Sequence, residues 1–151
     1  MGLWGVLPFE NDKACDRLSL FLNANWNGIY GMLMMGFESK NDDTVLMSAA
    51  ITDLILNGKD KTILGQDYRD TFTHRILADI EMKSGNEDDI EKLRKESYSA
   101  ICRLIYCGND GSWSDSDWKA HLEILERLKF KLDKYDFEER QSMLNQLEDR
   151  K

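Results

Sequence analysis

The chain has 151 residues, of which 32% are charged, and a formal net charge of −8 at pH 7. Phosphate binding needs lysine and arginine gathered on one surface, so the excess of acids disfavours nucleic acid as a partner. No run is long and apolar enough to cross a bilayer, and the length suits one domain, residues 1–151, with its own hydrophobic core.

The first segment of the chain, MGLWGVLPFENDKACD at 1–16, is rich in apolar residues. Large side chains such as Trp4 and Phe9 are costly to leave in water, at about 25 cal/mol per Å² of apolar surface. Pro8 favours extended backbone at the residue before it. We therefore expect residues 1–10 to form an extended, buried arm that leads directly into the first helix.

Apolar residues recur at helical spacing in the first half of the chain. This pattern predicts helices over 12–22, 29–37 and 45–56, with an interruption at 23–28 that contains Trp26. The second helix is dense in methionine, which we interpret mainly as gap-filling core, with an adaptable binding surface as the alternative. The third is apolar over a wide face and is expected to be the central helix.

The second half of the chain repeats this pattern, with polar capping residues before each apolar run. One helix is expected from the region of Tyr68 to Ser84, and a second opens at Asn86 and ends at Gly108. A third follows Ser114, and a last amphipathic helix begins near residue 136. Because strand-like alternation is almost absent, the predicted fold class is all-α, a single-domain helical bundle.

The N-terminal segment also resembles the opening of a protein family. The motif MGxWGxxxFENDxAxD is similar to the start of the domain-of-unknown-function 4259 family of small bacterial proteins. The matching residues are Gly2, Trp4, Gly5, Phe9, Glu10, Asn11, Asp12, Ala14 and Asp16. The chain departs from the family at Leu7 and Arg17. A weaker match comes late, at Trp118, Leu122, Leu125, Arg127 and Leu128. Proteins that resemble this family turn up beside toxin genes in bacterial competition systems, so the resemblance favours an immunity protein.

Motifs for catalysis are absent from the sequence, which has no phosphate-binding glycine loop, nucleophile elbow or metalloprotease helix. His121 is expected to be solvated or half-buried rather than to act as a catalytic base. The cysteines Cys15, Cys102 and Cys107 are interpreted as small core residues, and neither they nor the acidic loop at 109–117 have the ligand spacing of a zinc or calcium site. We therefore expect no enzyme activity, no cofactor and no metal. An odd number of cysteines without an export signal favours reduced thiols in a cytoplasm.

One loop, NDGSWSDSD at 109–117, combines several acids with an aromatic side chain. Its Trp113 is interpreted either as an exposed anchor for a partner or as a plug into the core. The acids could steer a basic partner, although helix capping and dipole compensation are the simpler explanation. The candidate partner-binding residues are Asp110, Trp113, Asp115 and Asp117, with Glu87, Asp88 and Asp89 expected to extend the same negative patch.

Two classes of function fit these features. The first is a cytoplasmic protein-binding inhibitor, an immunity protein that neutralises a toxic enzyme, with a basic nuclease of a bacterial competition system as the expected partner. The second is a non-enzymatic helical scaffold or protein-interaction module unrelated to toxins. A secreted toxin encoded immediately upstream would favour the first class, and an isolated gene would favour the second.

Overall fold

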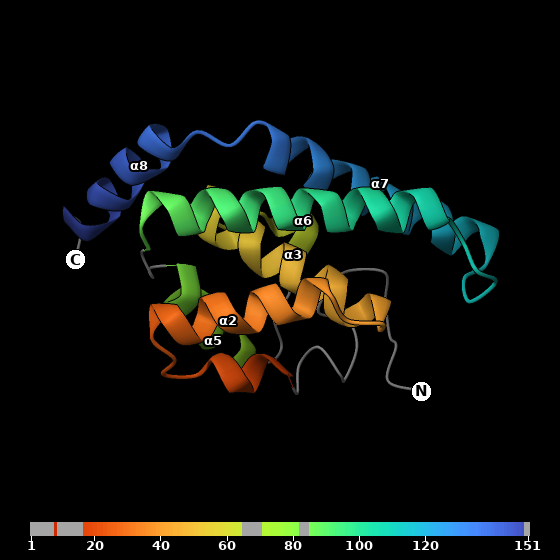
Figure 1. Ribbon diagram of the computed structural model, residues 1–151, viewed down its shortest axis with the longest axis horizontal. Helices are drawn as coiled ribbons and strands as arrows, with labels where there is room; N and C mark the ends of the chain where they lie inside the picture. Colours follow the sequence, from red (N-terminus) through yellow and green to blue (C-terminus); the bar gives the residue numbers. More distant parts are fainter. Residues whose placement is uncertain (1–7, 9–16, 65–70, 82–84, 150–151) are drawn as a thin grey trace.

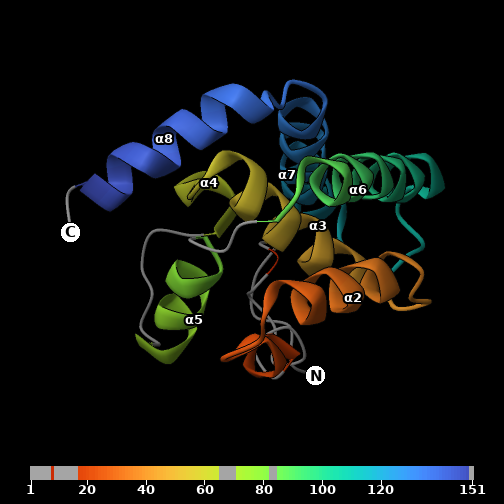
Figure 2. The same cartoon turned by 60° about the vertical axis from the view of Figure 1, so that its left-hand side comes forward.

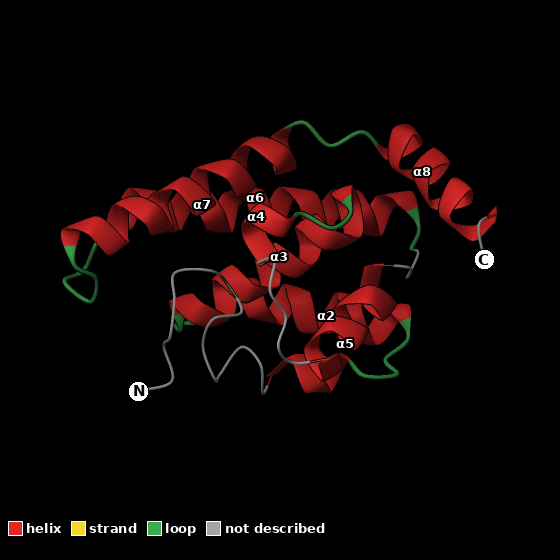
Figure 3. Cartoon of the chain, turned by 180° about the vertical axis from the view of Figure 1, so that it is seen from behind, coloured by secondary structure: helices red, strands yellow, loops and turns green. Residues whose placement is uncertain are grey.

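The computed structural model describes residues 8, 17–64, 71–81 and 85–149, and this part of the chain consists of helices and loops without a strand (Figure 1, Figure 3). The elements in chain order are η1 (Ser19–Phe21), α2 (Trp26–Phe37), α3 (Asp42–Asn57), α4 (Lys61–Leu64), α5 (Thr71–Glu81), α6 (Glu87–Cys107), α7 (Asp115–Asp133) and α8 (Phe137–Asp149). The predicted all-α bundle is confirmed. None of the described helices is long and apolar enough to span a membrane.

The predicted N-terminal arm falls almost entirely outside the described residues. Pro8 is the described position within it, and it is buried. Trp4 and Phe9 of the arm, and Cys15 after it, lie outside the described residues, so their expected burial stays a prediction. Of the helix predicted over 12–22, residues 17–22 are described, and they include the short 3₁₀ helix η1.

Helix α3 lies at the centre of the bundle, with α2, α5, α6 and α7 packed around it (Figure 2). Every side chain from Thr44 to Leu56 is buried, which confirms the predicted central helix. The Asn41 side chain caps its start by accepting a hydrogen bond of 2.9 Å from the backbone N–H of Asp43. Gly58 ends the helix at φ 86°, in the left-handed region that favours glycine.

Helices α6 and α7 lie side by side as an antiparallel pair, joined by the loop at 108–114 (Figure 1). Asn86 caps α6 by accepting from the backbone N–H of Asp89 at 2.8 Å, and Gly108 ends it at φ 69°. Ser114 caps α7 by accepting from the backbone N–H of Asp117 at 3.2 Å. Both predicted ends of α6 and the predicted start of α7 are thus confirmed, because each depends on local capping chemistry.

Helix α2 begins earlier than the sequence predicted. Trp26 was placed in an interruption, but it is the first residue of α2, because Asn25 caps this helix by accepting from the backbone N–H of Gly28 at 2.9 Å. The indole Nε1 of Trp26 donates to Asp89 Oδ2 at 3.0 Å and ties the start of α2 to the start of α6. The sequence also missed α4, a single helical turn.

Two predictions of core residues were wrong. Met32 and Met34 pack half-buried against the core, but Met35 is 75% exposed, because it lies on the outer side of α2. Cys102 is half-buried and Cys107 is exposed, so the thiols are not uniformly core residues. Leu104 is the last buried position of α6, Ile105 still packs against the core, and Cys107 lies beyond it at the exposed end of the helix.

We predict that Gly36→Ala destabilises the fold, whereas Gly31→Ala in the same helix does not. A Cβ at Gly36 would lie 1.9 Å from Ser48 Oγ and 2.9 Å from Ser48 Cβ, so α2 and α3 would have to separate. A Cβ at Gly31 meets nothing within 4 Å. Urea denaturation should show a loss of about 1–3 kcal/mol for Gly36→Ala, as for other overpacked cores. Equal stability of the two variants would contradict close packing at this crossing.

Candidate functional site

A cleft of about 310 Å³ lies where the start of α3, the end of α6 and the start of α7 meet. This is the end of the bundle that carries the α6–α7 loop (Figure 1). Leu46, Leu104 and Leu125 contribute apolar surface to it from the three helices. The loop residues Asp110 and Trp113 also line the cleft, so two of the predicted partner-binding residues belong to it.

Three aromatic rings pack together at one side of the cleft. The ring of His121 is stacked on Trp113 with centroids 4.4 Å apart and contacts Trp118 at 5.6 Å. His121 is only 8% exposed, so the expectation of a solvated or half-buried imidazole was wrong. Trp118 precedes it by three residues and therefore shares its helix face, while the loop places Trp113 on the ring. Both indoles remain half-buried, so Trp113 is neither a fully exposed anchor nor a core plug.

The side chain of Asn109 holds the loop that carries Trp113. Its Nδ2 donates to the backbone carbonyl of Trp113 at 2.9 Å, and its Oδ1 accepts from the backbone N–H of Gly111 at 3.0 Å and of Trp113 at 3.3 Å. Gly111 has a φ of 99°, which a residue with a side chain rarely adopts. Sequence reasoning missed Asn109, although an asparagine before Asp-Gly is a known signal for such a turn.

Carboxylates outnumber cations around the cleft. Among the described residues, Asp42, Asp43 and Asp110 line it together with a single lysine, Lys40. Hydrogen bonds from the side chain and backbone of Ser112 stabilise the charged form of Asp110 and lower its pKa. Asp42 and Asp43 were not among the predicted partner-binding residues, because the sequence does not show that the start of α3 lies opposite the loop.

The other predicted partner-binding residues lie elsewhere. Asp115 and Asp117 are exposed in the first turn of α7, beside the cleft in sequence but outside its lining. Glu87, Asp88 and Asp89 lie in the first turn of α6, at the opposite end from the loop. The 21 residues of α6 span about 30 Å, so these acids cannot extend the same patch, and that prediction was wrong. Asp89 is also engaged by Trp26.

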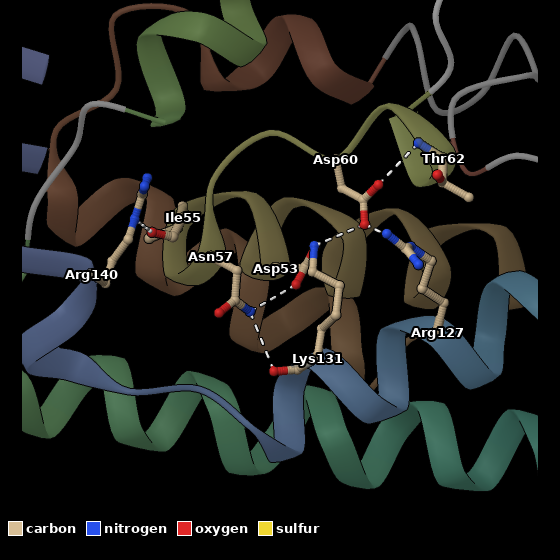
Figure 4. Close-up of polar contacts among 8 residues, drawn as sticks. All are labelled: Asp53, Ile55, Asn57, Asp60, Thr62, Arg127, Lys131 and Arg140. Carbon is tan, nitrogen blue, oxygen red and sulfur yellow. Dashed lines mark hydrogen bonds and ion pairs between the residues drawn. The ribbon is translucent and has the colours of Figure 1, made fainter. Parts of the chain in front are cut away.

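A second cluster of charges fixes α7 against α3 and α4 (Figure 4). Lys131 Nζ lies 2.7 Å from Asp53 Oδ2 and 3.0 Å from Asp60 Oδ2, and Arg127 Nε donates to the same Asp60 oxygen at 2.8 Å. Asn57 Nδ2 donates to Asp53 Oδ1 at 2.9 Å. Asp53 is 2% exposed, so this carboxylate depends on Lys131 for compensation of its charge.

The two carboxylates of this cluster differ in their pKa values. Burial raises the pKa of Asp53, although Lys131 and Asn57 act in the opposite direction. Burial also acts to raise the pKa of Asp60, but hydrogen bonds from Arg127 and Lys131 outweigh it and lower the value to about 2. The residues of this cluster belong to α3, to α7 or to the start of α4, which Asp60 immediately precedes, so we interpret the cluster as a structural lock that positions α7 and its aromatic residues.

The last helix is attached to the same region. Arg140 of α8 is 4% exposed, and its Nε donates to the backbone carbonyl of Ile55 at 3.2 Å, in the last turn of α3 (Figure 4). The negative end of a helix dipole favours a cation at this position.

Among the described residues, no group of three or more histidine, cysteine, aspartate or glutamate side chains is placed to hold a metal ion. No family model, curated protein or solved structure matches the chain. The likeness of the N-terminal segment to the domain-of-unknown-function 4259 family therefore stays a prediction from its motif.

The ion-pair cluster predicts different costs for removing its two cations. Lys131→Met leaves the buried Asp53 carboxylate without a cation, and we expect a loss of roughly 3–5 kcal/mol in the free energy of unfolding. Arg127→Met is the matched control, because Arg127 is 48% exposed and exposed pairs contribute about 0–1 kcal/mol. Urea denaturation of both variants checks this, and equal losses would show that Asp53 does not depend on Lys131.

Asp60 predicts a pH dependence of stability. A carboxylate with a lowered pKa stabilises the folded state above its unfolded pKa, and this contribution is lost as the pH falls through the folded value. We expect the stability difference between the wild type and Asp60→Asn to be greatest near neutral pH and to shrink as the pH falls from 3.8 towards about 2. Denaturation at several pH values measures it. A difference that stays constant over this range would exclude the ion pairs of Asp60 as its source.

Proposed function

We propose that the protein is a cytoplasmic inhibitor that binds another protein, an immunity protein that neutralises a toxic enzyme. The expected target is a basic nuclease of a bacterial competition system. The observation that carries this proposal is the cleft, in which the half-buried Trp113 and Trp118 lie beside carboxylates of α3 and of the α6–α7 loop. Such a function requires binding and no catalytic group.

The charge of the chain supports a basic partner. A net charge of −8 accelerates the association of a positively charged protein, and the effect weakens as salt screens it. In the part of the chain that the structure describes, three aspartates and one lysine line the cleft. A basic enzyme that binds nucleic acid would meet a surface of opposite charge at this end of the bundle.

Aromatic residues can prolong the lifetime of a complex, because the hot spots that contribute most of the binding energy of an interface are enriched in tryptophan. Asn109 and His121 already hold Trp113 in position, so little conformational freedom remains to be lost on binding. A preorganised indole next to carboxylates is suited to a tight inhibitor.

The alternative function, a scaffold unrelated to toxins, has its own supporting observation. Tyr106 is 91% exposed and Met35 is 75% exposed, and neither lines the cleft. Large apolar side chains of this kind could contact a different partner. Variants at these positions separate the two proposals.

Co-expression tests the inhibitor proposal. Genes next to the coding sequence would be expressed in the cytoplasm of a test bacterium, each alone and together with this protein. We expect one neighbour to be toxic alone and harmless when the inhibitor is present, with stoichiometric inhibition of the purified enzyme. If no neighbour is toxic, or if toxicity persists in the presence of the protein, the immunity proposal fails.

Once the partner is identified, Trp113→Ala should weaken the binding of this protein to the partner by about 2 kcal/mol or more, as for an interface hot spot. The same change should cost about 0.5–1.5 kcal/mol of folding stability through the lost stacking on His121. Tyr106→Ala is the control at an exposed position outside the cleft. Calorimetric titration of both variants measures the affinities. A loss on Tyr106→Ala with none on Trp113→Ala would favour the scaffold.

A further inference from the structure

We propose that the cleft between α3, α6 and α7 binds the guanidinium group of an arginine side chain presented by the partner protein. The inference rests on the proposed function, because it specifies the part of a basic partner that the cleft receives. It is carried by the combination of two indole rings and three carboxylates around one concave surface.

The size of the cleft suits one long side chain. Its volume of about 310 Å³ is at the lower limit of pockets that bind small molecules. Leu46, Leu104 and Leu125 supply apolar surface, against which the methylene groups of an arginine stem can pack. The charged end of such a side chain then lies among the aromatic and acidic residues.

The aromatic residues favour a flat cation. A guanidinium group is planar and weakly hydrated, so it stacks on indole faces more readily than the compact ammonium group of lysine does. His121 is stacked on Trp113 and tilted against Trp118, which fixes both indoles beside the cleft. The two rings are therefore in place before a ligand arrives.

The carboxylates favour a ligand that donates several hydrogen bonds. Asp42 and Asp43 come from the first turn of α3 and Asp110 from the opposite loop, so acceptors face the cleft from two elements. The lowered pKa of Asp110 keeps this acceptor charged. A guanidinium group has five N–H donors in a fixed fork that matches carboxylate geometry. Lys40 is the one lysine or arginine in the described part of the lining, and it opposes such a ligand.

The probe for this proposal is N-acetyl-arginine amide, compared with the citrulline compound of nearly the same shape and no charge. The readout is the indole N–H signals of the full-length protein in ¹⁵N NMR spectra. We expect the arginine probe to shift the signals of Trp113 and Trp118 saturably and to leave Trp26 unchanged. Citrulline should bind about tenfold more weakly, because it lacks the cation that the rings and carboxylates recognise.

Three variants test the electrostatic part. Asp43→Asn should weaken arginine binding and Lys40→Gln should strengthen it, so the two changes move the affinity in opposite directions. Asp88→Asn is the matched control, because it removes the same charge at the far end of α6 and should leave binding unchanged. Circular dichroism confirms that each variant is folded. Changes in the same direction for Asp43→Asn and Lys40→Gln would overturn the proposal.

The remaining outcomes are equally decisive. Equal binding of arginine and citrulline, or no shift at millimolar probe, would overturn the proposal, and so would tighter binding of N-acetyl-lysine amide. Failure of the inhibitor proposal gives a different result from failure of the cleft assignment. In that case the arginine probe binds the cleft, but co-expression neutralises no toxin. If a toxin is neutralised and the arginine probe does not bind, the cleft assignment alone fails.

Discussion

The burial of α3 on every side is the constraint on which the rest of the structure depends. This helix is not uniformly apolar, because Ser48, Thr52 and Asp53 lie within its buried stretch. The helix also buries the hydroxyl group of Thr44, and those of Ser48 and Thr52 donate to backbone carbonyls one turn earlier, at 2.8 Å each. Asp53 has only Asn57 as a hydrogen-bond donor on its own helix, so its carboxylate requires a cation from another element. Lys131 supplies this cation, and in doing so it fixes where α7 lies.

The position of α7 connects the ion-pair cluster to the cleft. Lys131 and Arg127 lie towards the end of this helix, whereas Trp118 and His121 lie near its start. Thirteen residues separate Trp118 from Lys131, which corresponds to about 20 Å along the helix axis. One helix thus pairs with the end of α3 through charges and presents aromatic rings next to the start of α3. This arrangement brings Asp42 and Asp43 opposite the α6–α7 loop.

The parts of the fold that were predictable from the sequence are those set by short-range chemistry. Asn41, Asn86 and Ser114 cap helices within three residues of themselves, and Gly58 and Gly108 end helices through their own backbone conformation. Trp26 was misplaced because its partner, Asp89, is 63 residues away. The candidate site was predicted only in part, because only some of its residues lie close together in the sequence. Asp110 and Trp113 are only three residues apart in the chain, whereas Asp42 and His121 join them through tertiary packing that hydrophobic periodicity does not encode.

The ties between distant residues also bear on how the chain folds. Helical bundles usually fold fast because their contacts are local. Here the Trp26–Asp89 hydrogen bond closes a separation of 63 residues, and the Lys131–Asp53 bond closes one of 78. Closing a loop of this length costs conformational entropy before the contact itself contributes any favourable energy. The charge of Asp53 is compensated only when α7 is docked, so the central helix reaches its full stability only together with the helix that completes the cleft.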